Sequence, residues 1–171
     1  ETSTLTSQDG VTSTTVAFHP NRSEIAVGDR FGRIRILNPV DQTVRVDSTS
    51  FPERIQSLTY DRTGAFLAVA GAHGEVEILS VSERLEVVRR VREASSTIRL
   101  VRDPRRDRVA VCAPGSATRL IGLKDPALDM FMLGAAGSVR AAAFRSSGGI
   151  SLLSDRGRVS LTDEKGVLQK R

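Results

Sequence analysis

The stretch DRTGAFLAVAGAHGEVEIL, residues 61–79, contains the pattern from which the fold can be read. DRTG is a turn sequence, and FLAVA is the short apolar run expected of a strand that is buried on both faces. GAHG is a second turn. EVEIL then alternates polar and apolar residues, as a strand with one wetter face does. The stretch therefore predicts a turn and two short strands that are joined by a glycine turn.

The same pattern recurs through the chain at a spacing of 42 residues. Phe18, Tyr60, Arg102 and Phe144 mark equivalent positions, and the fourth copy is one residue short between Phe144 and Ile150. In each copy a short apolar strand precedes the stretch and a more polar candidate strand follows it. A period in this range is typical of repeat architectures, in which each unit packs mainly on its neighbours.

Four short antiparallel strands per repeat predict an all-β fold, a β-propeller built of four-stranded antiparallel blades. Helical periodicity competes only near residues 81–92, and there the recurrence of the strand pattern favours a strand. Residues 1–7 are expected to form the outer strand of a preceding or closing blade. The four expected blades cover residues 11–47, 55–91, 97–133 and 138–171.

Several segments resemble the WD-repeat family over essentially the whole chain. These are LTSQDGV (5–11), VAFHPN (16–21), GDRFGRIRILN (28–38), LGAAGSV (133–139) and SDRGRVSL (154–161). The chain lacks tryptophan, and Leu37, Leu79, Ile121 and Thr162 stand where the family usually has it. Asp29 and Asp155 are expected to keep the family's turn aspartate. The resemblance implies propeller architecture and does not identify a subfamily.

The two ends of the chain favour an open run of four blades cut from a larger propeller. Such an arc would expose an apolar sheet face at each end, and exposed faces and strand edges promote association. A small closed ring of four blades is one alternative, and a ring completed by two or more chains is another.

Composition sets further bounds. The chain has 171 residues, of which 39% are hydrophobic, enough for a packed core. No apolar stretch reaches the 18 residues of a spanning helix, so no membrane partner is expected. Cys112 is the only cysteine, which excludes an internal disulfide and favours the cytoplasm.

The sequence contains no recognisable catalytic constellation. The two histidines, His19 and His73, occupy non-equivalent positions in different repeats, and neither has the companions of a metal site. No nucleophile elbow, phosphate loop or dinucleotide fingerprint is present. We therefore expect a protein that is not an enzyme and that has no cofactor, with a propeller hydrolase as a remote alternative.

Binding is the favoured class of function. The resemblance implies that partners contact the rim formed by the loop before the innermost strand and the turn between the second and third strands. The expected job is a non-catalytic protein–protein interaction scaffold within a larger multidomain protein of signalling or sensor type, with a protein or peptide as partner. The polar side chains expected at this rim are Arg30, Arg33, Arg54, His73, Arg92, Arg156 and Arg158.

An arginine cluster at residues 84–108 supports an alternative partner. This segment holds nine arginines and four acidic residues, an excess that equals the chain's net charge of +5. Guanidinium groups pair well with phosphates, so the cluster could bind nucleic acid or another polyanion. The chain has few aromatic residues to stack on bases, however. Charge runs more often form solvated faces, and we therefore place this function second.

Overall fold

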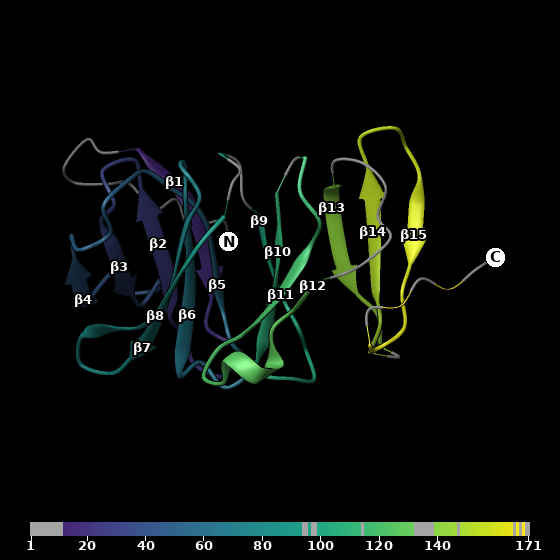
Figure 1. The fold of residues 1–171 in the computed structure, drawn as a ribbon. Coiled ribbons are helices and arrows are strands. Elements are labelled where there is room, and N and C mark those ends of the chain that lie inside the picture. Colours follow the sequence, from purple (N-terminus) through teal and green to yellow (C-terminus); the bar gives the residue numbers. More distant parts are fainter. Residues whose placement is uncertain are drawn as a thin grey trace.

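The computed structural model describes residues 12–93, 96, 99–113, 115–131, 139–146, 148–165, 167 and 169. These residues form four antiparallel sheets, which lie side by side in chain order (Figure 1). The predicted all-β class and the repetition of antiparallel sheets are therefore confirmed. The outer strand expected at residues 1–7 lies outside the described residues.

Each sheet corresponds to one repeat of the sequence. Sheet 1 contains β1 (Ser13–Phe18), β2 (Ile25–Asp29), β3 (Ile34–Leu37) and β4 (Val44–Ser48). Sheet 2 contains β5 (Ile55–Tyr60), β6 (Phe66–Gly71), β7 (Glu75–Val81) and β8 (Leu85–Arg92). Sheet 3 contains β9 (Arg99–Arg102), β10 (Arg108–Cys112), β11 (Arg119–Gly122) and β12 (Met130–Phe131). Sheet 4 contains β13 (Val139–Phe144), β14 (Ile150–Ser154) and β15 (Val159–Leu161).

The outer strands differ most between the repeats. Residues 85–92 form strand β8, so the helical alternative for this segment is wrong. A single 3₁₀ turn, η1 (Pro126–Leu128), precedes the two-residue strand β12. Within the described residues sheet 4 has three strands rather than the four expected. The chain beyond β15 still returns alongside it, because Gln169 N–H donates to the Leu161 carbonyl oxygen at 2.8 Å.

The repeat extends to details of strand register that the sequence pattern did not predict. The pairing of the first two strands is irregular between Ser13 and Thr15, between Ile55 and Ser57, and between Val139 and Ala141. These positions are equivalent in the repeat. Such a β-bulge bends the strand and increases its twist. The one-residue slip of the fourth copy falls in the β13–β14 turn, as expected, and leaves the strand pairing unchanged.

Each sheet has two apolar faces, which we name by the direction in which they pack. The leading face is the one that in sheet 2 carries Leu58, Tyr60, Leu67, Val69 and Leu79. The trailing face is the one that in sheet 1 carries Ala17, Ala26, Ile34, Ile36 and Val46. Strand alternation separates the two sets, and cross-strand pairs such as Ala17↔Ala26 keep each set on one side.

The described residues form four buried apolar clusters, of which three lie between two successive sheets and the fourth, made of Ile25, Val27 and Leu37, lies on the leading face of sheet 1. The leading face of sheet 2 packs on the trailing face of sheet 1. The next cluster joins the leading face of sheet 3 to Ala68, Ala70, Val76 and Ile78 of sheet 2. The third joins Ile150 and Leu152 of sheet 4 to sheet 3. The first strands also follow one another in space, because β5 contacts β1 and β9 contacts β5 and β13.

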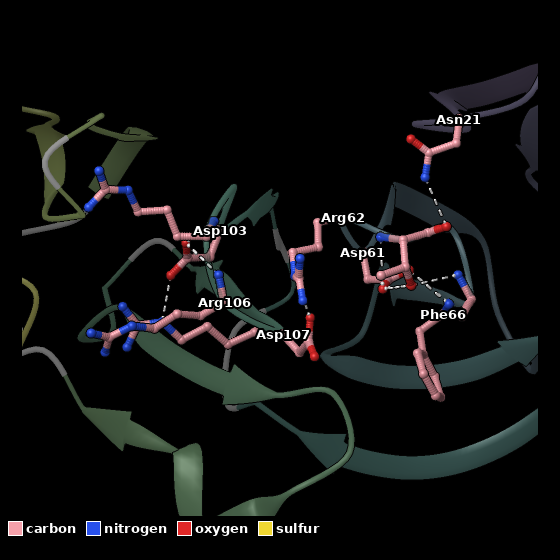
Figure 2. A network of polar contacts seen from close by, with 11 residues as sticks. Asn21, Asp61, Arg62, Phe66, Asp103, Arg106 and Asp107 are labelled. Atoms are coloured by element: carbon pink, nitrogen blue, oxygen red, sulfur yellow. Dashed lines mark hydrogen bonds and ion pairs between the residues drawn. The ribbon is translucent and has the colours of Figure 1, made fainter.

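The turns between the first and second strands lie at one end of the sheets, which we call the lower end after its place in Figure 1. Asp61 and Asp103 are equivalent in the repeat, and both are buried in these turns. The Asp61 carboxylate accepts from Thr63 N–H and Phe66 N–H, and that of Asp103 accepts from Arg105 N–H and Arg106 N–H (Figure 2). Such contacts satisfy backbone donors that the tight turn leaves unpaired.

Polar contacts at the lower end also connect successive sheets. Asn21 donates to the Thr63 carbonyl oxygen between sheets 1 and 2, and Arg62 pairs with Asp107 between sheets 2 and 3 (Figure 2). Arg106 pairs with Glu164 of the fourth repeat. Because exposed pairs contribute little each, the apolar clusters are the main attachment between the sheets.

His19 occupies the turn position that aspartate fills in repeats 2 and 3. Its Nδ1 accepts a hydrogen bond from Asn21 N–H at 3.1 Å, and its ring packs on that of Tyr60 with 5.0 Å between centroids. Burial lowers the pKa of His19, although Glu24 nearby partly opposes this. The neutral imidazole is therefore the form that the folded chain favours.

We expect acid to destabilise the chain through His19. Because the pKa is lower in the folded state, the unfolded chain binds the proton more readily, and this contribution to stability falls as pH drops through the ordinary histidine range. Urea unfolding at pH 7 and pH 5 would measure the loss. His19→Asn keeps an acceptor for Asn21 N–H without a titrating ring, so its stability should fall less. Equal losses in the two proteins would contradict the assignment.

Candidate functional site

The turns between the second and third strands lie at the opposite end of the sheets, which we call the upper end (Figure 1). In sheet 1 this turn is held by Asp29. Its Oδ1 accepts from Phe31 N–H at 2.7 Å and from Arg33 N–H at 3.0 Å, and the side chain is buried. The aspartate therefore fixes the turn that presents Arg30 and Phe31 to solvent.

In sheet 2 the equivalent turn, between β6 and β7, is stabilised by a residue that the sequence did not single out. Gly71 stands where sheet 1 has Asp29, and the Glu53 carboxylate takes its place. Glu53 Oε2 accepts from His73 N–H at 2.6 Å and Oε1 accepts from Glu75 N–H at 3.2 Å. A β-carbon at position 71 would collide with this carboxylate. The sequence did contain a signal for this cap: the loop before β5 has a glutamate, and the repeat position that holds aspartate in sheet 1 holds glycine in sheet 2.

Sheet 4 corrects one assignment that came from the family resemblance. The expected turn aspartate was Asp155, but the side chain in the structural position of Asp29 is Ser154. Ser154 Oγ accepts from Arg158 N–H at 3.1 Å, as Asp29 does from Arg33 N–H in sheet 1. The shortened β13–β14 turn moves the equivalent position back by one residue, which explains the misassignment.

Two exposed arginines and an exposed aromatic ring lie where sheets 1 and 2 meet at the upper end. The Arg30 guanidinium lies over the Phe31 ring at 4.6 Å from its centroid, and both side chains are exposed. Arg54 precedes β5, and its carbonyl oxygen accepts from Ala72 N–H of the β6–β7 turn. The loop before β5 contacts the β2–β3 turn closely, because a β-carbon at Gly32 would collide with the Phe51 carbonyl oxygen. We call Arg30, Phe31 and Arg54 the upper-end patch.

The other predicted residues around this patch already have acidic partners. Arg33 Nε donates to Asp47 at 2.7 Å, and this hydrogen bond is the main reason that the pKa of Asp47 lies below its ordinary value. His73 Nδ1 pairs with Glu53. Arg92, at the end of β8, pairs with Glu75 at 3.5 Å. These side chains surround the upper-end patch, and their charges are largely neutralised by the acidic partners.

All seven predicted residues lie at the upper end, but in two groups. Arg30 and Arg33 lie on the β2–β3 turn of sheet 1, and Arg54, His73 and Arg92 lie at the same end of sheet 2. Arg156 and Arg158 lie on the β14–β15 turn of sheet 4, with sheet 3 between the groups (Figure 1). Both are exposed, and neither forms an ion pair with any residue in the described part of the chain. Phe31 is the exposed residue that the sequence did not single out.

Most of the arginine cluster at 84–108 is neutralised by carboxylates. Six of its nine arginines form ion pairs, at distances from 2.5 to 3.5 Å. These pairs are Arg84–Glu86, Arg89–Asp129, Arg90–Glu77, Arg92–Glu75, Arg106–Glu164 and Arg108–Asp103. Arg99, Arg102 and Arg105 have no such partner within the described ranges.

The Arg89–Asp129 pair shows that these arginines also join sheets. Arg89 lies on β8 of sheet 2, whereas Asp129 lies beside β12 of sheet 3 and also pairs with Arg119. Burial alone would raise the pKa of Asp129, but hydrogen bonds from Arg89 and Gly122 N–H outweigh it, so that its pKa lies below the ordinary value. The folded chain therefore favours the ionised form of Asp129, which forms the ion pair between sheets 2 and 3.

Comparisons with known proteins add no assignment. No model of a protein family matches the chain, and a search of curated proteins gives no match. In the described part of the chain, no group of three or more His, Cys, Asp or Glu side chains is arranged to hold a metal ion. The same residues include no helix with the length and apolar character needed to cross a membrane.

Proposed function

We propose that this chain is a non-catalytic protein-interaction scaffold of the WD-like β-propeller type, which works in the cytoplasm as part of a larger protein. Support for the architecture comes from the repeated antiparallel sheets, the succession of first strands and the packing of leading on trailing faces. This is the way in which propeller blades pack around an axis. The upper end is the proposed binding surface.

The observation that carries the proposal is the upper-end patch. Arg30 and Arg54 are exposed and have no carboxylate partner among the described residues, while the acids around them hold other groups. Phe31, 63% exposed, adds an apolar contact beside them. Two arginines without a carboxylate partner, next to an exposed aromatic ring, suit an acidic peptide segment, because arginine binds carboxylates through two parallel hydrogen bonds. The partner that we propose is an acidic segment of another protein.

We rank nucleic acid second as a partner. The arginine cluster at 84–108 was the argument for a polyanion, but most of its guanidinium groups are paired with acids of the same chain. Such pairing lowers the local positive potential that attracts phosphates. Arg99, Arg102 and Arg105 remain as the phosphate-binding candidates.

A binding titration with fluorescent polyglutamate tests the proposal. Arg30→Gln/Arg54→Gln should weaken binding roughly 2- to 30-fold, because each exposed ion pair contributes about 0.2–1 kcal/mol. The matched control is Arg22→Gln/Arg105→Gln, which removes the same charge from exposed positions at the lower end. Equal weakening by the two variants, or none by the first, would overturn the proposal. A single-stranded DNA that binds more tightly and loses affinity in the control variant would establish the second function.

A further inference from the structure

The upper end of sheets 3 and 4 carries a second group of exposed arginines. Arg156 and Arg158 lie on the β14–β15 turn, and Arg140 lies near the start of β13, at the same end of sheet 4 (Figure 1). Arg99 is the first residue of β9 in sheet 3, and β9 contacts β13. All four residues are exposed, and none forms an ion pair with another residue in the part of the chain that the structure describes. We call Arg99, Arg140, Arg156 and Arg158 the second patch.

Arg140 occupies the irregular position in the pairing of β13 with β14, where β13 has one extra residue. In sheet 1 the equivalent residue is Thr14, and its hydroxyl donates to the Ile55 carbonyl oxygen at 2.6 Å. The repeat spacing gives neutral residues at this position in the first three copies, namely Thr14, Gln56 and Ile98. Because a β-bulge redirects the side chain of the extra residue, the fourth copy presents a cation where the other copies have none.

The acidic residues of repeats 3 and 4 lie mainly at the opposite end. Residues 97–171 contain seven acids, of which Asp155 is the one at the upper end. The other six lie at the lower end, in the turns that follow β9, β11 and β15. The residues of this range that the structure does not describe include no acid in the sequence. The upper end of sheets 3 and 4 is therefore positively charged, and such a surface attracts anionic ligands.

Sheet 3 separates the second patch from the upper-end patch. In the sequence, residues 113–118 of its β10–β11 turn include no charged side chain. Glu93, which follows β8 at the upper end of sheet 2, pairs with Arg119 and is only 11% exposed. Packed sheets lie about 10 Å apart, so that sheets 2 and 4 are separated by about 20 Å. An extended peptide advances about 3.3 Å per residue, and about 6 residues cover this distance.

We propose that the acidic segment of the partner binds the upper-end patch and the second patch at the same time. The ligand is then an extended acidic stretch of roughly ten residues or more, rather than a single short acidic motif. Contact with one patch makes contact with the other intramolecular, which raises the affinity above that of either patch alone. This inference rests on the proposed function, because it assumes an acidic protein segment that binds at the upper end.

An acidic protein segment suits the second patch better than single-stranded nucleic acid does. Phe131 and Phe144 are the only aromatic residues in repeats 3 and 4. The bases of a single strand would therefore have few rings on which to stack. Carboxylates need no such rings, because each guanidinium group can donate two parallel hydrogen bonds to one carboxylate.

A titration of the ¹⁵N-labelled chain with two polyglutamate peptides, of about 4 and about 16 residues, tests the inference. The short peptide reaches one patch, and the long peptide reaches both. Amide shifts at residues 29–33 report the affinity at the upper-end patch alone. Arg156→Gln/Arg158→Gln should weaken the long peptide there roughly 2- to 30-fold and leave the short peptide unchanged. The matched control, Arg22→Gln/Arg105→Gln, removes the same charge at the lower end and should affect neither peptide.

Equal weakening of both peptides by Arg156→Gln/Arg158→Gln would overturn the inference, because the second patch would then act only through its general charge. No weakening of either peptide would overturn it as well. So would a single-stranded DNA that binds more tightly than the long peptide and loses affinity in this variant. The proposed function fails separately, if Arg30→Gln/Arg54→Gln binds the short peptide as tightly as the unaltered chain does.

Discussion

Replacing Asp103 with alanine is expected to lower the free energy of unfolding by about 3–5 kcal/mol, the cost of leaving a buried charge without its partner. Asp103 and Arg108 are 1% and 4% exposed, and Arg108 Nε donates to the carboxylate at 2.6 Å. The same carboxylate accepts from two backbone N–H groups of the β9–β10 turn (Figure 2). Chemical denaturation of both proteins at neutral pH measures the loss.

Asp61→Ala is the matched control, since Asp61 caps the equivalent turn of sheet 2 and has no arginine partner among the described residues. It should cost only about 1–3 kcal/mol, the range for unsatisfied buried hydrogen-bonding groups. Adding Arg108→Phe to Asp103→Ala should recover part of the loss, because Phe66 is the residue of sheet 2 at the position of Arg108. An Asp103→Ala variant no less stable than Asp61→Ala would show that the buried ion pair does not carry this cost.

The second large effect is expected for Gly32→Ala, at about 2–5 kcal/mol, because two separate costs add. Gly32 has φ of +82°, a conformation that costs an L-residue about 1–2 kcal/mol. A β-carbon there would also collide with the Phe51 carbonyl oxygen, which belongs to backbone and cannot rotate away; such overpacking costs about 1–3 kcal/mol. Thermal or urea unfolding gives the sum.

Gly157→Ala separates the two costs. Gly157 is the equivalent glycine of sheet 4, with φ of +73°, but no atom lies within 4 Å of the position of its β-carbon. This variant should show only the conformational cost of about 1–2 kcal/mol. Equal losses at the two positions would mean that the loop before β5 does not pack on the β2–β3 turn as described, and the upper-end patch would lose its support.

Periodicity was sufficient to predict the strands, because it records which residues must be buried together. The spacing of Phe18 and Tyr60 placed both on one face of successive sheets, and the structure agrees. The sequence could not show that one is buried and the other exposed, since burial depends on what neighbours each sheet. The short β12 and the three strands of sheet 4 also depend on tertiary contacts that a repeat pattern does not encode.

The candidate site was predictable in its position but not in its electrostatics. The order of strands places Arg30 and Arg54 at one end, as the repeat implied. Which arginines are paired depends on acids far away in sequence, such as Asp129 with Arg89. The Glu53 cap was missed for the same reason, because its carboxylate comes from a loop 18 residues before Gly71, the position at which the repeat pattern would place the turn aspartate.

The most direct test of the proposed scaffold function is an NMR titration of the ¹⁵N-labelled chain with polyglutamate, which maps where the acidic probe binds. We expect the largest amide shift changes at residues 29–33, 51–54 and 71–75, which surround the upper-end patch. The lower-end turns at residues 19–24 and 103–108 should change little. Changes that cluster at the lower end, or none at saturating peptide, would contradict the proposal that this chain binds acidic partners at its upper end.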